Sequence, residues 1–234
     1  MKVKLHIPGY PRIGRNRELK KKLESYWAGK ATIDELLRTA DSIKNENWLK
    51  QSALDYITVG DFALYDHVLE TSLLFGAVPE RFSSLKTRDR YELMFAVARG
   101  RSSGSETIGA SPMRKWFNTN YHYIVPEISD QTLFHPDAAA LLADIGKAAK
   151  QGKNIKLVLP GPATYLWLSG IDGSEVSAGS LPEDLCGCYL QLFRLLKNPE
   201  TTGADLLEWV QLDEPIAAFD RLDDNWKNVL SRTW

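Results

Sequence analysis

Five short segments of the chain alternate apolar and polar residues or are rich in β-branched and aromatic residues, a pattern typical of strands. Most of them run into proline, glycine or aspartate, where a strand gives way to a turn. The predicted strands are Val3–Ile7, Tyr56–Gly60, Tyr121–Val125, Ile155–Leu159 and Leu207–Leu212.

Between these segments, apolar residues recur at intervals of three or four, which predicts amphipathic helices. Asn16 is the predicted N-cap of the first helix, and Gly29 ends it. Thr32 opens the second, with Asp34 and Glu35 in its first turn, where the positive helix end favours acidic side chains. Helices are expected over residues 16–27, from 32 to beyond 43, and over about 63–75, 86–99, 137–150 and 182–196.

Two stretches rich in small residues, 101–110 and 174–180, are predicted to be loops, and the first is expected to be mobile. The alternation of strands and helices predicts the α/β class with a parallel sheet, most simply a (βα) barrel of TIM type. A closed barrel of this type needs about eight strands. The five predicted strands therefore indicate an incomplete barrel, formed by residues 1–234 as a single domain.

The composition excludes several classes of protein. No apolar run approaches the roughly 18–20 residues that span a bilayer. The N-terminus lacks the apolar stretch of a secretion signal, and the two cysteines, Cys186 and Cys188, form no disulfide framework, so a cytoplasmic location is expected. Phosphate-loop, dinucleotide and serine-hydrolase motifs are missing, and neither cysteines nor histidines have the spacing of a metal site. We expect no metal on this chain.

Charge is unevenly distributed although the net charge is −1. Residues 1–22 contain eight Lys or Arg residues and a single acidic residue, whereas residues 181–234 contain ten Asp or Glu and five Lys or Arg. A sequence pI near 6.4 argues against a nucleic-acid partner. The basic N-terminal stretch can attract a smaller anion such as a phosphate or a polycarboxylate.

The strongest candidate site follows the first predicted strand, at residues 8–20. Arg17, Lys20 and Lys21 are spaced so that their charges share one helix face, near helix N–H groups that favour an anion. Arg12 and Arg15 are possible additional anion contacts. The alternative is a solvated basic helix without a ligand.

Two further segments carry candidate chemistry. Residues 113–123 combine aromatic side chains with Lys115, which either completes an anion site or belongs to an aromatic packing cluster. Asp61 follows the second predicted strand, where capping is the structural alternative to catalysis, and the adjacent Asp66 and His67 do not face each other on a helix. Asp213 and Glu214 follow the last strand, and at most one of the two points into a pocket.

Several long blocks of the sequence resemble cobalamin-independent methionine synthase, in the order in which that family has them. The first is GYPRIGRNRELK at residues 9–20, and another is KWFNTNYHY at residues 115–123. The remaining blocks are residues 24–30, 60–69, 161–168 and 209–215.

The resemblance implies a function. The family's enzymes have two (βα)₈ barrels, need zinc, and transfer a methyl group from 5-methyltetrahydropteroyltri-glutamate to homocysteine. In that family, the glutamate tail of the folate is bound by two parts of the protein. They are the segment that matches Arg17, Glu18, Leu19 and Lys20 here, and the lysine that matches Lys115. The zinc-bearing C-terminal barrel is expected to be absent, so this chain alone is expected to be inactive, with no cofactor or catalytic residue of its own.

Residues 101–110 and 197–205 look less familiar than the matching blocks, and the sequence after Pro215 is expected to depart from the family. A truncated gene product, an engineered fragment and a natural short paralogue all fit these observations. One alternative function is a non-catalytic interaction or regulatory protein that binds a C-terminal catalytic domain or self-associates through exposed sheet edges. Another is an independent small barrel enzyme that uses Asp61, His122 and Asp213.

Overall fold

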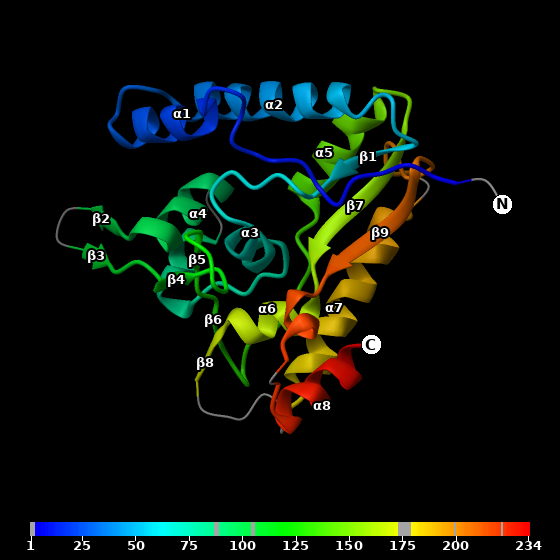
Figure 1. Cartoon of the computed structure of the whole chain (residues 1–234). Coiled ribbons are helices and arrows are strands. Elements are labelled where there is room, and N and C mark those ends of the chain that lie inside the picture. Colours follow the sequence, from blue (N-terminus) through cyan, green and yellow to red (C-terminus); the bar gives the residue numbers. More distant parts are fainter. Residues whose placement is uncertain (1–2, 87–88, 104–105, 173–178, 199, 221) are drawn as a thin grey trace. The chain divides into compact units, whose positions relative to one another are not determined.

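The computed structural model describes residues 3–86, 89–103, 106–172, 179–198, 200–220 and 222–234. The chain divides into two compact units (Figure 1). Unit 1 comprises residues 1–64, 139–159 and 195–211, and unit 2 comprises residues 65–138, 160–194 and 212–234. Most of the expected loop at 174–180 lies outside the described residues.

Unit 1 is built on a parallel sheet with the strand order β1-β7-β9. Strands β1 (Tyr56–Val59), β7 (Asn154–Pro160) and β9 (Leu207–Asp213) correspond to three of the predicted strands. Every residue of β1 is buried, as expected for a strand covered on both faces. Helix α5 (Ala139–Ala149) packs against β1, and the Trp48 indole donates a 2.9 Å hydrogen bond to the Thr58 carbonyl.

Helices α1 (Glu18–Trp27) and α2 (Ile33–Lys50) lie side by side in unit 1 (Figure 1). The predicted start of α2 is confirmed. The Thr32 hydroxyl accepts a hydrogen bond from the Glu35 backbone N–H, while the Glu35 carboxylate accepts one from Thr32 N–H. This reciprocal capping box satisfies two N–H groups that have no partner within the helix.

The predicted strand at Val3–Ile7 is wrong, because this segment is not part of the sheet. Its backbone meets β1 only near Asp55, whose N–H donates to the Leu5 carbonyl and whose carboxylate accepts from Leu5 N–H. The alternating apolar side chains do not face a core, since Val3 is 78% and Leu5 56% exposed. The alternation of apolar and polar residues does not by itself show whether a segment pairs with a neighbouring strand.

Aromatic side chains connect this segment to the sheet. The His6 ring contacts the edge of Trp209, with the ring centroids 5.5 Å apart. Trp209 also stacks on Tyr56 of β1, with the two ring centroids 4.7 Å apart. The Tyr56 hydroxyl in turn donates a 2.7 Å hydrogen bond to the Glu208 carboxylate.

Unit 2 contains the other elements. Two are predicted helices that begin later than expected, α3 (His67–Leu74) and α4 (Arg90–Arg99). Helix α7 (Leu181–Leu196) matches its prediction. The remaining helices are α6 (Pro162–Leu168), α8 (Asp224–Thr233) and the 3₁₀ helices η1 (Glu80–Leu85) and η2 (Pro215–Ala218).

Three pairs of short strands lie among the described residues of unit 2. Strands β2 (Arg101–Ser103) and β3 (Glu106–Ile108) pair antiparallel, so the predicted loop at 101–110 is wrong: much of it is paired strand. Strands β4 (Met113–Lys115) and β5 (His122–Ile124) are also antiparallel, and β5 is the predicted strand at 121–125. Strands β6 (Glu127–Ser129) and β8 (Gly170–Asp172) pair in parallel.

The α/β class and the parallel sheet are therefore confirmed. The described residues contain no closed barrel, because their longest sheet has the open order β1-β7-β9.

Candidate functional site

The basic segment after Ile7 is an irregular stretch held against unit 1 by side chains. The Asp61 carboxylate accepts a 2.7 Å hydrogen bond from Tyr10 N–H and a 2.5 Å bond from the Thr58 hydroxyl. The Asn47 amide donates to the Pro11 carbonyl. Asp61 therefore anchors the segment, which accounts for its carboxylate structurally without a catalytic role.

A buried lysine holds the same segment from the middle of the sheet. Lys156 in β7 is only 1% exposed. Its ammonium group donates to the Ile7 carbonyl at 2.6 Å and to the Gln211 side-chain oxygen at 2.5 Å, and lies 3.0 Å from His6 Nδ1. Since an ammonium group has no acceptor, His6 Nδ1 accepts this bond. Gln211 also donates to the Pro8 carbonyl, which fixes the chain just before the basic residues.

Arg12, one of the candidate cations, is bonded to the backbone of the protein. Its guanidinium donates to the carbonyls of Ala63 and Leu64 at 3.1 and 3.3 Å. Arg15, Arg17, Lys20 and Lys21 are exposed. Lys20 forms a 3.7 Å ion pair with Glu24 one turn further along α1. The sequence correctly placed Arg17, Lys20 and Lys21 around the start of one helix.

Helix α1 begins differently from the prediction. Its N-cap is Arg17, not Asn16, and Arg17 has the left-handed φ of 61°. Such a conformation costs a non-glycine residue on the order of 1 kcal/mol or more. The Glu18 carboxylate accepts a 2.9 Å hydrogen bond from Asn16 N–H. Bonds from its own backbone N–H and from Asn16 lower the pKa of the Glu18 carboxyl below its usual value.

Leu19 has a different environment from the charged residues beside it. Its side chain is completely buried. It therefore anchors α1 in the core of unit 1, and its side chain is not available to a ligand. The four-residue segment 17–20 thus consists of two exposed cations, a carboxylate turned to the backbone and a core residue.

Lys115 lies in unit 2, on an exposed part of β4 opposite His122 of β5. Lys115 therefore belongs to a different unit from Arg17 and Lys20, which are part of unit 1. The aromatic residues that follow Lys115 pack together: Phe117 stacks on Trp167 with the ring centroids 5.1 Å apart, and Phe219 contacts both rings. Phe117 has the unusual φ of 47°.

The other predicted carboxylates have structural partners in unit 2. Asp66, not Asp61, is the N-cap in its region: it accepts from Leu69 N–H at 2.8 Å and from Ile124 N–H at 3.2 Å. Burial raises the pKa of Asp66 to about 6. Sequence reasoning treated Asp66 only as part of an acid–base pair, although an Asp before an apolar helix is also a cap signal.

Glu214 lies at the start of α6. Its carboxylate accepts hydrogen bonds from the N–H groups of Ala163 and Thr164 at 2.9 and 2.7 Å, and from the Thr164 hydroxyl. Burial raises its pKa. The carboxylate thus occupies the helix start, and the neighbouring Asp213 is exposed, so the two do not form a paired acid–base site.

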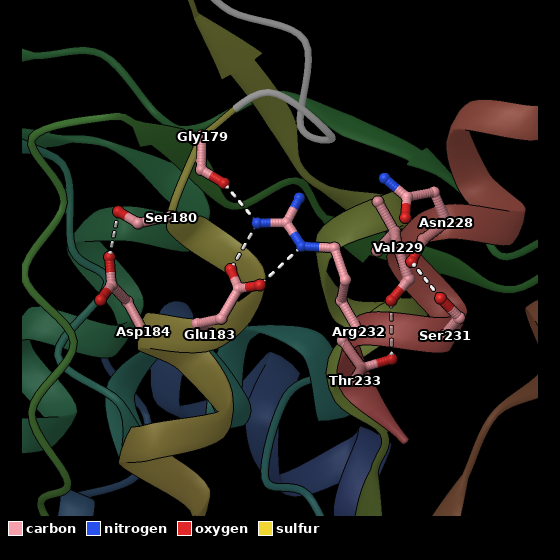
Figure 2. Close-up of polar contacts among 9 residues, drawn as sticks. All are labelled: Gly179, Ser180, Glu183, Asp184, Asn228, Val229, Ser231, Arg232 and Thr233. Carbon is pink, nitrogen blue, oxygen red and sulfur yellow. Dashed lines mark hydrogen bonds and ion pairs between the residues drawn. The ribbon is translucent and has the colours of Figure 1, made fainter.

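Helix α8 is attached to α7 by an arginine (Figure 2). The Arg232 guanidinium donates to both carboxylate oxygens of Glu183, at 2.6 and 2.5 Å, and to the Gly179 carbonyl at 2.8 Å. This bidentate pair lowers the pKa of Glu183. It fixes the end of the described chain to the helix before β9.

Within the described ranges, no three His, Cys, Asp or Glu side chains come together as metal ligands. Cys186 and Cys188 are both free thiols. The side chains that the structure describes therefore do not fit a zinc ion. No helix among these residues is long and apolar enough to cross a membrane.

The sequence from residue 4 to 234 matches the family described as "Cobalamin-independent synthase, N-terminal domain". The chain belongs to this family. The resemblance found in the sequence blocks is confirmed, but the expected departure after Pro215 is wrong, because the match to the cobalamin-independent synthase family continues to residue 234.

Several curated relatives are named 5-methyltetrahydropteroyltriglutamate–homocysteine methyltransferase. The chain is 42% identical over 237 residues to that of Buchnera aphidicola subsp. Cinara cedri, and 43% identical over 237 residues to that of Nitrosomonas europaea. Both matches cover 100% of this chain and 30% of the relative. The protein of Nitratidesulfovibrio vulgaris is 44% identical over 225 residues, covering 95% of this chain and 28% of its own length. The chain thus spans about 30% of the length of these relatives.

Proposed function

We propose that this chain is the folate-polyglutamate-binding part of a cobalamin-independent methionine synthase. The whole enzyme transfers a methyl group from 5-methyltetrahydropteroyltri-glutamate to homocysteine. In this proposal the segment Arg17–Lys20 and Lys115 bind the glutamate tail, and Arg15 and Lys21 add longer-range attraction. Arg12 contributes by holding the segment in place.

The observation that carries the proposal is the group of exposed cations at the start of α1, in a family member whose relatives are named for a triglutamate substrate. A triglutamate tail is a polycarboxylate, and Arg and Lys bind carboxylates by charge-assisted hydrogen bonds. The buried Leu19 and the contacts of Asp61 and Lys156 fix the backbone from which these cations project. Preorganised cations lose less entropy on binding.

The proposal assigns this chain no zinc and no catalytic residue, so methyl transfer needs the remainder of the enzyme. It also takes the parallel β1-β7-β9 sheet as part of a (βα) barrel that other segments complete. No turnover is expected from this chain alone, even with zinc and both substrates. Activity that appears on addition of a C-terminal catalytic barrel would support a divided enzyme.

The direct test is a thermal melt of the purified chain with triglutamyl and with monoglutamyl methylfolate. A ligand that binds only the native state raises its stability by about 2.7 kcal/mol at a hundredfold excess over Kd. We expect the triglutamate to raise Tm much more than the monoglutamate, and Lys20→Ala to reduce the difference. A cooperative melt that neither ligand shifts would contradict the proposal.

A second candidate function, an interaction protein, is favoured by strand β9. It lies at the end of the order β1-β7-β9, and its Trp209 and Val210 are 43% and 42% exposed. An exposed edge strand is a template for pairing with another chain. Light scattering after size exclusion distinguishes this function: a concentration-dependent dimer that Val210→Lys abolishes would support it, and a strict monomer without ligand response would count against it as self-association.

A further inference from the structure

We propose that Glu18 is a positioning residue of the glutamate-tail site: its carboxylate fixes the turn that presents Arg17 and Lys20 and does not contact the anion. This inference rests on the proposed function and refines it. A segment of two cations, a carboxylate and a leucine does not by itself say which of the side chains meet the ligand. The structure separates their roles.

The first argument is the direction of the carboxylate. Glu18 Oε2 accepts the Asn16 backbone N–H at 2.9 Å, which is shorter than either backbone bond that closes the turn. Those bonds run from Arg17 N–H to the Gly14 carbonyl at 3.3 Å and from Leu19 N–H to the Ile13 carbonyl at 3.4 Å. The side chain of Glu18 therefore bends back over the turn that precedes its own helix.

The second argument is the glycine beneath the carboxylate. A Cβ atom built on Gly14 would overlap Glu18 Oε2 and would lie 3.3 Å from Ile43 Cδ1. Gly14 has a φ of 81°, and Arg17, at the other end of the turn, has a φ of 61°. A turn with a left-handed non-glycine residue persists only where its surroundings hold it. The Glu18 carboxylate lies against Gly14 and accepts the Asn16 N–H, and so stabilises the turn in this conformation.

The two possible roles of Glu18 predict effects of opposite sign. A carboxylate beside a bound polyanion repels it, so removal of the charge would strengthen binding. A carboxylate that holds the turn strengthens binding indirectly, so removal would let Arg17 leave its strained conformation and would weaken binding. The sign of the change therefore identifies the role.

Isothermal titration of triglutamyl methylfolate into three variants tests this sign. We expect Glu18→Ala to raise Kd about fivefold or more, the equivalent of losing one hydrogen bond of typical net strength. Glu18→Gln keeps an amide oxygen that accepts Asn16 N–H, and should retain most of the affinity. The matched control is Glu24→Ala on the same helix, which releases Lys20 from its 3.7 Å ion pair and should leave Kd unchanged or lower it.

Gly14→Ala disturbs the same turn in two ways, because its Cβ displaces the Glu18 carboxylate without altering its charge and because alanine disfavours the φ of 81° at this position. It should weaken binding as Glu18→Ala does, while the thermal melt shows that the chain remains folded. Tighter or unchanged binding by Glu18→Ala, in a protein where Lys20→Ala weakens it, would overturn the inference.

A readout without ligand separates this inference from the proposed function. The amide resonance of Asn16 should shift with pH in the wild-type protein, with a midpoint below the usual Glu value of 4.5, and should not do so in Glu18→Gln. A wild-type chain that shows this titration but binds no triglutamate would contradict the proposed function and leave Glu18 as a purely structural residue, overturning its positioning role. An Asn16 amide that does not respond to Glu18 would overturn the inference directly.

Discussion

Each unit buries an ionisable side chain that joins segments far apart in the sequence, but the two charges are opposite in sign. Lys156 of unit 1 is 1% exposed and bonds to Ile7, 149 residues earlier. Asp66 of unit 2 is 7% exposed and accepts a hydrogen bond from Ile124, 58 residues later. In each case, one charged side chain connects two segments that are far apart in the sequence.

The difference lies in what surrounds each charge. Asp66 is at the start of α3, where N–H groups lack helix partners and the helix dipole favours a negative charge. Lys156 is in the central strand of its sheet. The segment without secondary structure brings the Ile7 carbonyl to it, and the neighbouring strand β9 brings the side-chain oxygen of Gln211. The environment of Asp66 is largely local, whereas that of Lys156 depends on the tertiary fold.

The largest effect is expected from Lys156→Met, which breaks the unit 1 cross-link. At least two acceptors, the Ile7 carbonyl and the Gln211 side chain, lose their donor. At 1–3 kcal/mol for each unsatisfied buried group, the free energy of unfolding should fall by roughly 4 kcal/mol. Urea denaturation measures this change, and hydrogen exchange should show faster exchange at residues 5–12. The exposed Lys150→Met is the control, and an equal loss in both variants would contradict a special role for Lys156.

Asp66→Asn should change how stability depends on pH. With a folded pKa of about 6 and an ordinary value of 3.8, folded Asp66 retains a proton that the unfolded chain releases. The free energy of unfolding should therefore fall as pH rises from about 4 to about 6, by about 3 kcal/mol. Asn keeps an acceptor oxygen and caps helices well, so the variant should lack this fall and be at least as stable above pH 6.

Urea denaturation over a pH series measures the difference between wild type and Asp66→Asn. The matched control is Asp89→Asn, which also removes a capping carboxylate, but at the exposed start of α4. A wild-type-minus-variant difference that stays constant between pH 4 and pH 6 would show that the charge of Asp66 is not penalised by burial.

The smallest effect is expected from Arg232→Ala, which removes a charge pair near the surface. Glu183 and Arg232 side chains are 52% and 24% exposed, and such pairs contribute at most about 1 kcal/mol. Faster amide exchange in the last turn of α8 should be the clearer signal. Lys227→Ala, which breaks a pair within α8 itself, is the control. If Arg232→Ala lowered the free energy of unfolding as much as Lys156→Met does, burial would not determine how much a charged side chain contributes to stability.

The same distinction between local and tertiary causes explains which elements the sequence predicted. Helix α2 was predicted with its cap because Thr32 and Glu35 are close in the chain. The start of α1 was misplaced because the carboxylate of Glu18, not the side chain of Asn16, completes the turn. Val3–Ile7 alternates like a strand, but it is held by side chains of residues distant in the sequence and not by backbone pairing with another strand.

The candidate site was predictable in composition but not in the roles of its members. Charge spacing alone placed Arg17, Lys20 and Lys21 together, residue types suggested Lys115, and the resemblance added Glu18 and Leu19. The sequence could not indicate that Arg12 is bonded to the carbonyls after β1, since Ala63 and Leu64 are about fifty residues away. Nor could it indicate that Glu214 caps α6, which begins far upstream in the chain.

The stacked Tyr56–Trp209 pair, with His6 at its edge, gives the protein an optical reporter of its N-terminal segment. The emission of an indole shifts to longer wavelength when water replaces a ring that packs against it. Detachment of residues 5–8 from Lys156 would therefore alter the emission of Trp209. A Trp209→Phe difference spectrum isolates this signal from the other six tryptophans, so the state of the segment that leads into the basic residues can be followed in solution without a label.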